Sequence, residues 1–224
     1  MASSLVGQLA SYVDFDKQSL RISAASIIFN PLFWNSDKEG GRGKWLIQSH
    51  IFAEYRNQVL SKLFGGNRTL ANYALAATIF SIGIIRDWLY KTAILEQPTH
   101  PALQGLPTQA AAYTLLAAGN VLVVTSTWRL GIRGTFLGDY FGFLQEKMVT
   151  GFPFNVTGAP MYWGSTMSFL GTALLFGRPA GVVLTALVYV VYVVALRFED
   201  PFTAGIYAKR DRDRAAAKAG KKSN

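Results

Sequence analysis

The sequence contains no cysteine and only two histidines. Without cysteine the chain forms no disulfide, builds no zinc–thiolate site and has no cysteine nucleophile. Charged residues are scarce as well, because they make up 16% of the chain, against roughly a quarter in an average soluble domain. Half of the residues are hydrophobic. These shortages favour a membrane protein over a soluble domain.

The hydrophobic residues are gathered into long blocks without charge, which lie at residues 22–36, 69–85, 97–128, 148–177 and 179–196. A membrane-spanning helix needs about 20 mostly apolar residues, and three blocks reach or nearly reach that length. The last block is rich in valine, but a helical backbone in lipid finds its hydrogen-bond partners only within its own helix. We therefore predict an all-α integral membrane protein with about three to four transmembrane helices.

Two spans are clear from the sequence, at residues 70–90 and 110–130. Arg86 and Asp87 are expected to close the first of them at the membrane surface. Residues 165–196 are long enough for two passes, but a glycine, an arginine and a proline interrupt them. A hairpin and a single crossing both remain open from the sequence.

The N-terminal part of the chain is less apolar. Residues 18–35 hold an apolar stretch shorter than a full span and are expected to form a re-entrant or interfacial segment. Residues 45–64 have apolar side chains at helical spacing, with Glu54 on another face. This pattern predicts an amphipathic helix, either in the headgroup plane or packed on other protein. We divide the chain into an N-terminal intramembrane or interfacial region (1–64), a transmembrane core (65–207) and a basic cytosolic tail (208–224).

Positive charge is concentrated at the C-terminus. The net charge is +9, and seven of the 22 basic residues lie in the last sixteen positions. A basic end beside an apolar span is typical of a cytosolic tail that touches anionic lipid. These residues flank membrane segments and build no nucleic-acid-binding module, so we expect no nucleic-acid partner. Lys221 and Lys222 resemble the dilysine address for return to the endoplasmic reticulum, which favours that membrane, with a mitochondrial membrane as the alternative.

Three segments carry polar or aromatic groups beside the predicted spans, where lipid penalises polar groups. The acids Glu199 and Asp200 follow the last apolar block. The macrodipole disfavours acids at the C-terminal end of a helix, so we expect a cation nearby. The other two segments, residues 134–142 and 158–165, combine glycine with aromatic residues. Each segment alone is equally typical of a helix end or an aromatic belt at the interface.

Together these segments resemble the phospholipid N-methyltransferase family, in particular its small fungal and animal members that complete phosphatidylcholine synthesis. The resemblance runs in order from about residue 20 to residue 207. It implies S-adenosylmethionine as methyl donor and methylated phosphatidylethanolamines in the bilayer as acceptors. The motifs that carry it are Asn-Pro-Leu-Phe-Trp (30–34), Gly-Thr-Phe-Leu-Gly-Asp-Tyr-Phe-Gly (134–142), Phe-Pro-Phe-Asn (152–155), Pro-Met-Tyr-Trp-Gly-Ser-Thr (160–166) and Glu-Asp-Pro-Phe-Thr-Ala-Gly-Ile-Tyr (199–207).

The resemblance also implies roles for individual residues. Family members have a Glu-Glu pair after the last span and a Gly-x-Gly motif inside an earlier span, and both are assigned to the methyl donor. The acidic pair corresponds to Glu199-Asp200. The glycine motif falls on Ala117-Ala118-Gly119, where only the second glycine is kept. The small alanine side chains still allow close backbone approach.

The chemistry needs a base and a site for a cation. The acceptor amine resembles lysine, with a reference pKa of about 10.4, and only its neutral form attacks a methyl sulfonium. We predict that Glu199 accepts the proton, with Asp139 as a second candidate base. The substituted ammonium is expected to contact the aromatic faces of Tyr140, Tyr162 and Trp163, although membrane anchoring explains these residues equally well. No metal is required.

Two other interpretations remain open from the sequence. An isoprenylcysteine carboxyl methyltransferase uses the same methyl donor, but that family carries Arg-His-Pro before the tyrosine, whereas this chain has Gly158-Ala159-Pro160-Met161-Tyr162. A non-enzymatic membrane scaffold explains the spans but gives no reason for paired acids beside a proline. The sequence leaves the oligomeric state undetermined.

Overall fold

The computed structural model describes residues 11–35, 54 and 57–220. In this described part all regular structure is helical, which confirms the all-α prediction. The elements are α2 (Gln18–Asn35), α4 (Val59–Leu63), α5 (Arg68–Leu95), η1 (Pro101–Leu103), α6 (Leu106–Thr135), η2 (Gly138–Phe141), α7 (Pro160–Leu175) and α8 (Pro179–Gly220).

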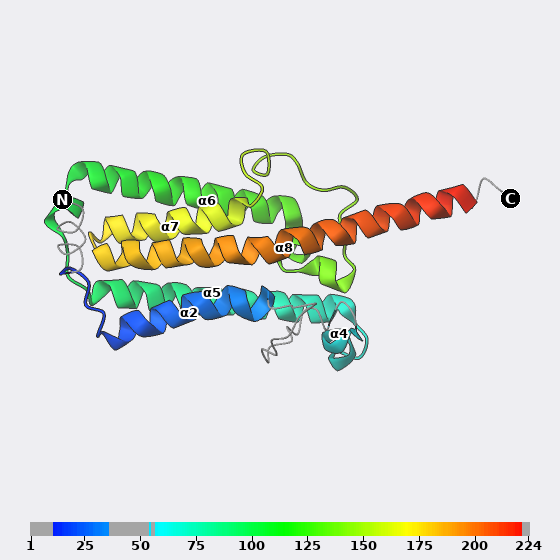
Figure 1. Ribbon diagram of the computed structural model, residues 1–224, viewed down its shortest axis with the longest axis horizontal. Helices are drawn as coiled ribbons and strands as arrows, with labels where there is room; N and C mark the ends of the chain where they lie inside the picture. The colour runs from blue at the N-terminus through cyan, green and yellow to red at the C-terminus, as the bar shows by residue number, and fades with distance from the viewer. Residues whose placement is uncertain (1–10, 36–53, 55–56, 221–224) are drawn as a thin grey trace.

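The long helices of the described part lie side by side, and successive ones run in opposite directions (Figure 1). α6 packs against α7, α7 against α8, and α2 lies against both α5 and α8. One end of the bundle, the turn end, holds the α5–α6 connection and the α7–α8 turn, where the His100 backbone N–H donates to the Gly177 carbonyl over 2.9 Å. The other end, the tail end, holds α4, η2 and the point where α8 leaves the bundle (Figure 1).

Within the described residues, three helices are long and apolar enough to cross a membrane: α5, α6 with its extension through η2, and α8. The predicted second span ends where α6 is interrupted by Gly131, which has a φ of 66°. α7 has 16 residues and is about 24 Å long. Gly177, with a φ of +61°, reverses the chain before Pro179 starts α8. α7 and α8 therefore form a helical hairpin, although α7 is not one of the three helices that are long and apolar enough to cross a membrane.

α2 belongs to the bundle. It is a continuous helix of 18 residues, so residues 18–35 do not turn back on themselves as a re-entrant loop would. Leu20 and Ile27 lie about two helical turns apart, so they share one face. Both are buried in the same apolar cluster as Val188 and Tyr192 of α8. The N-terminal segment thus contributes a packed helix to the core.

The segment before α5 differs from the expected amphipathic helix over residues 45–64. Residues 45–53 and 55–56 lie outside the described part, and the helix described next to them, α4, has only five residues. Gln58 precedes α4 with a left-handed φ of 53°, so a continuous helix through this position is wrong. The buried carboxylate of Glu54 explains the break, because it accepts hydrogen bonds from the backbone N–H groups of Leu60 (2.6 Å) and Ser61 (3.0 Å). Glu54 therefore satisfies orphan donors in the first turn of α4 instead of occupying a solvent-facing position.

α6 and α7 approach each other closely along a line of small residues. A Cβ built on Gly119 would lie 2.5 Å from the carbonyl oxygen of Gly164, and a Cβ on Gly164 would lie 2.6 Å from the carbonyl oxygen of Gly119. A Cβ on Gly171 would lie 2.9 Å from the carbonyl oxygen of Ala112. Small residues allow this backbone contact between membrane helices. The position of α7 therefore depends on these glycines.

Candidate functional site

The site lies at the tail end of the bundle, where α7 begins beside α8. α7 starts at Pro160, a residue favoured in the first turn because its missing N–H needs no partner there. Tyr162 faces α8, and its hydroxyl donates a hydrogen bond to the carboxylate of Glu199. Gly164, two residues further, lies against Gly119 of α6. Because two residues turn a helix by roughly half a circle, α7 separates the Glu199 side from Gly119.

Glu199 and Asp200 lie inside α8 and not at its end. The helix continues through Pro201 to Gly220, because a proline removes one helical hydrogen bond without necessarily ending the helix. The predicted helix end at this acidic pair is therefore wrong, and the two acids do not lie at the negative end of the helix dipole. The described partner of Glu199 is the Tyr162 hydroxyl, whereas Asp200 is exposed.

Asp139 is brought to the same side of α8 as Glu199. Leu137, with a φ of 58°, turns the chain into the short helix η2, and Gly138 follows where a Cβ would lie 2.3 Å from a backbone carbonyl oxygen. This turn directs Asp139 to α8, where its carboxylate accepts a hydrogen bond of 3.2 Å from the Thr203 hydroxyl. Thr203 lies one helical turn after Glu199. The structure thus unites the two carboxylates that the sequence analysis named as candidate bases.

A second polar group, centred on Arg86, lies deeper in the bundle, whereas the sequence predicted a position for this residue at the membrane surface. Arg86 does not close a span at the surface, because α5 continues to Leu95 and the Arg86 side chain is only 13% exposed. Its Nη1 donates to the Tyr192 hydroxyl over 2.7 Å, and that hydroxyl lies 3.1 Å from Ser165 Oγ. The Tyr192 ring meets the Tyr162 ring edge-on, with centroids 4.9 Å apart. The usable signal in the sequence was a charged residue between apolar stretches, which in a membrane helix indicates function.

The three aromatic residues predicted to form a cage occupy different surroundings. Tyr162 bonds to Glu199. Tyr140 is 3% exposed and lies in an apolar cluster with Ala71 and Leu75 of α5. Trp163 is exposed, with its ring tilted against that of Tyr189 at 5.6 Å. The Tyr162 hydroxyl contacts the candidate base Glu199, and the Tyr140 backbone N–H donates to the carboxylate of Asp139 over 3.2 Å. A role of Tyr140 and Trp163 in substrate binding stays a prediction.

The small residues assigned to the methyl donor lie on α6. Ala117 is exposed, Ala118 is half-buried, and Gly119 is buried against Gly164. The described structure gives Gly119 a role in helix packing. Binding of the methyl donor by this segment stays a prediction.

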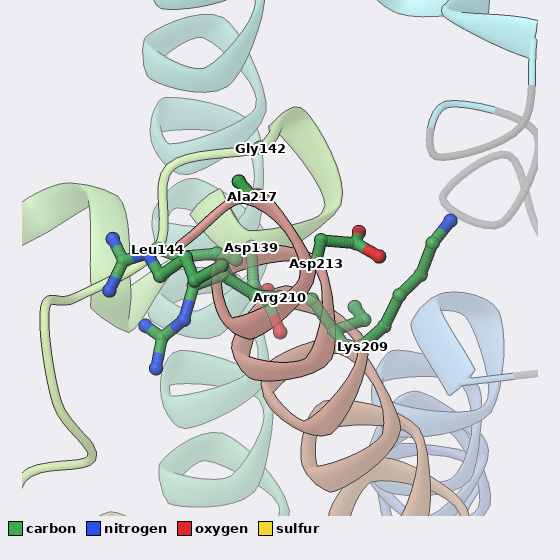
Figure 2. Close-up of a pocket in the computed structure, with 9 residues that line it drawn as sticks. Asp139, Gly142, Leu144, Lys209, Arg210, Asp213 and Ala217 are labelled. Atoms are coloured by element: carbon green, nitrogen blue, oxygen red, sulfur yellow. The ribbon is translucent and has the colours of Figure 1, made fainter. Parts of the chain in front are cut away.

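An open pocket of about 430 Å³ lies beside the part of α8 that leaves the bundle. Ligand pockets commonly have volumes of about 300–1,000 Å³. Figure 2 shows Lys209 and Asp213 extending to the same side of α8. The pocket therefore offers charges of both signs to a polar ligand. Its lining residues are Asp139, Gly142, Leu144, Ile206, Lys209, Arg210, Asp213, Arg214 and Ala217.

The loop after η2 is tied to this part of α8. The Tyr207 hydroxyl accepts a hydrogen bond of 3.2 Å from the Gln145 backbone N–H, and Arg210 donates to the Gln145 carbonyl. The Arg210 guanidinium also stacks over the Tyr207 ring at 4.7 Å. These contacts hold the pocket wall next to Asp139.

Comparisons with known proteins agree with this arrangement. The sequence profile of the family described as phospholipid methyltransferase matches residues 107–210. The chain is 59% identical to a phosphatidyl-N-methylethanolamine N-methyltransferase of Neurospora crassa, over 95% of this chain and 93% of the relative. It is 47% identical to the Saccharomyces cerevisiae enzyme of the same name, over 93% and 94% of the two chains. No solved structure matches.

Similarity extends to animal proteins. A phosphatidylethanolamine N-methyltransferase of Homo sapiens is 41% identical, over 91% of this chain and 95% of the relative. All of these relatives carry the names of methyltransferases, which argues against the non-enzymatic scaffold. Identity of this level over nearly the whole chain shows that the protein is a membrane-bound methyltransferase belonging to the phospholipid methyltransferase family.

Proposed function

We propose that this enzyme methylates phosphatidyl-N-methylethanolamine and phosphatidyl-N,N-dimethylethanolamine to phosphatidylcholine, with S-adenosylmethionine as the methyl donor. The observation that carries the proposal is the hydrogen bond from Tyr162 to Glu199 at the tail end of an apolar bundle, with Asp139 bonded to Thr203 one turn further along α8. The names of the most similar relatives support this class of acceptor.

The site lies at the depth that a lipid headgroup occupies. Glu199 follows Pro179, the first residue of α8, by 20 residues, which is a distance of about 30 Å along the helix. The hydrocarbon core of a bilayer is about 30 Å thick. If the turn end lies at one membrane surface, Glu199 lies at the other. An amine on a phospholipid headgroup reaches this level without leaving the bilayer.

At neutral pH the acceptor amine is protonated, so the reaction needs a base, and the carboxylates can accept the proton. With an amine pKa of about 10.4, roughly one acceptor molecule in a thousand or fewer is neutral at pH 7, and forming that species costs about 4–5 kcal/mol. Glu199 accepts the proton, directly or through water, while the Tyr162 hydroxyl orients its carboxylate. The nitrogen lone pair then forms the new N–C bond as the S–C bond breaks. Asp139 is the second candidate acceptor for the proton.

The mixed charges at the tail end fit the polar groups of a methyl donor that carries an amino group, a carboxylate and a sulfonium. When bound, the donor supplies an electrophilic methyl group. We assign Lys209 to its carboxylate, and Asp213 or Asp200 to its amino group, because these side chains are exposed on α8 at the tail end, where a water-soluble molecule approaches.

The arrangement also supports a cytosolic C-terminus and a location in the endoplasmic reticulum membrane. The tail of α8 shares the tail end with Lys62 of α4, Arg68 at the start of α5 and Arg133 near the end of α6. Such an excess of positive charge marks the cytosolic side of a membrane protein. The proposed site therefore faces the cytosol.

Purified protein in nanodiscs of defined lipid composition tests the function. Methyl-labelled S-adenosylmethionine is offered with monomethylated phosphatidylethanolamine, and the products are identified by mass spectrometry. We expect label in dimethylated lipid and phosphatidylcholine, and no label in a prenylated cysteine peptide. Label in the peptide alone would support the isoprenylcysteine alternative, and label in neither would refute the proposal.

A further inference from the structure

Arg86 is an arginine inside a helix that crosses the membrane, and its side chain points into the bundle. An arginine inside a membrane helix is energetically costly, and such residues mark functional sites or their supports. Its neighbour Asp87 has a side chain that is 61% exposed, whereas the Arg86 side chain is 13% exposed. The protein therefore directs this cation away from lipid and toward α7 and α8.

Because Arg86 can only donate hydrogen bonds, it determines which of its neighbours accept and which donate. Its Nε and Nη2 donate to Asp87 Oδ1 over 3.0 and 2.9 Å, and its Nη1 donates to the Tyr192 hydroxyl oxygen over 2.7 Å. Arginine has no acceptor and keeps its proton, so the Tyr192 oxygen must be the acceptor. The hydroxyl proton of Tyr192 is then free to be donated to Ser165 Oγ, which lies 3.1 Å away.

The guanidinium of Arg86 also contacts an aromatic ring of α7. Its guanidinium lies over the Phe169 ring, 4.9 Å from the centroid, and that ring meets Tyr90 edge-on at 4.5 Å. The Tyr90 hydroxyl donates to the Phe169 carbonyl over 2.8 Å. Arg86 is thus fixed by contacts with α5 and α7 in addition to its hydrogen bond to α8.

Tyr192 links Arg86 to the site, because it contacts both Arg86 and Tyr162. Tyr192 lies seven residues before Glu199, which is about 10 Å along α8. Its ring packs edge-on against Tyr162, and Ser165 lies about one turn after Tyr162 on α7. Tyr162 in turn donates to Glu199. One chain of contacts therefore joins the cation in α5 to the carboxylate in α8.

We propose that Arg86 is a positioning residue for the reaction: through the Tyr192 hydroxyl it sets the orientation of the Tyr162 phenol that holds Glu199. The inference rests on the proposed function, because Glu199 is the proton acceptor there. Arg86 itself contacts neither the amine nor the methyl donor. Its loss should lower turnover, with little change in the affinity for either substrate.

Tyr192→Phe is the sharpest test, because it removes one oxygen and keeps the ring. We expect kcat to fall about tenfold, the factor that corresponds to about 1.4 kcal/mol for one lost hydrogen bond, while KM for both substrates stays within about twofold. Tyr113→Phe is the matched control, since Tyr113 is exposed on α6. A loss of kcat equal to that of the control would overturn the proposal.

A double-mutant cycle separates positioning from a merely structural role. If Tyr192 acts through Tyr162, the Tyr192→Phe change should have little further effect in a Tyr162→Phe enzyme, because contacting residues of one network are not additive. Equal factors in both backgrounds would show that Tyr192 acts elsewhere and would contradict the proposal. Arg86→Lys, which keeps the charge but not the planar fork, should restore part of the activity that Arg86→Gln loses.

Infrared difference spectroscopy keeps this inference separable from the proposed function. The carboxyl band of Glu199 is identified by its loss in Glu199→Gln, and Tyr192→Phe should shift that band, whereas Tyr113→Phe should not. A shift in an enzyme that methylates no lipid amine would support the positioning and refute the function. An unmoved band would refute the positioning, whatever the activity.

Discussion

Replacing Gly119 with alanine tests the packing of the whole site. A Cβ at this position would lie 2.5 Å from the Gly164 carbonyl oxygen and 2.7 Å from Ser168 Oγ. Nonbonded heavy atoms are ordinarily about 3.5 Å apart, so α7 must retreat from α6 by about 1 Å. Overpacking of this kind costs about 1–3 kcal/mol.

The same retreat should disturb catalysis. Tyr162 lies two residues before Gly164 on α7, so it moves with the helix and its bond to Glu199 is displaced. A misplacement of about 1 Å can reduce turnover about 100-fold. We therefore expect Gly119→Ala to lower thermal stability and kcat together.

The assay combines thermal unfolding in detergent with kinetics and direct binding of S-adenosylmethionine. At about 2–4 °C per kcal/mol for a chain of this size, the melting temperature of Gly119→Ala should fall by several degrees. Gly83→Ala is the matched control, because a Cβ there meets no atom of the described residues within 4 Å, and alanine is the better helix former. An unchanged melting temperature with a selective loss of donor binding would refute the packing argument and favour direct contact of Gly119 with the methyl donor.

Two further predictions rest on described contacts, and a third rests on the proposed orientation in the membrane. Glu199→Gln should lower kcat by about 100-fold or more, and Asp139→Asn by a smaller factor, since Tyr162 orients only Glu199; steady-state kinetics would contradict this assignment if the order were reversed. Glu54→Ala should cost about 1–3 kcal/mol of stability by leaving two N–H groups of α4 unpaired, without changing kcat. Asn67 and Asn155 belong to glycosylation sequons, but both flank the tail end, so neither should gain a glycan in microsomes; a glycan on either would reverse the proposed orientation.

Much of the architecture could be predicted because a bilayer imposes strong rules on a sequence. Uncharged blocks of about 20 residues must be helical in lipid, and α5, α6 and α8 cover the predicted spans. The break at Gly131 falls where the second span was expected to end. The family resemblance was also available from ordered motifs alone, and the relatives confirm it.

Local patterns failed at two places, where a side chain reached the backbone of a neighbouring turn and where a helix continued through a proline. The helix expected through residue 58 is broken because Glu54 reaches α4 and bonds to its first N–H groups. The acidic pair looked like a helix end because it follows the last apolar block, yet α8 continues to Gly220. The spacing of apolar residues predicts neither the hydrogen bonds of Glu54 to the backbone nor the continuation of α8 through Pro201.

By itself, the sequence determined that the chain is helical, membrane-embedded and equipped with Glu199, Asp139 and Tyr162 near the ends of its spans. Only the tertiary structure decided that these three side chains meet at one end of the bundle, that residues 160–196 fold back as a hairpin, and that Arg86 faces inward. The physical reason is that hydrophobicity is a property of each segment, whereas a hydrogen bond between Tyr162 and Glu199 depends on how closely α6, α7 and α8 pack.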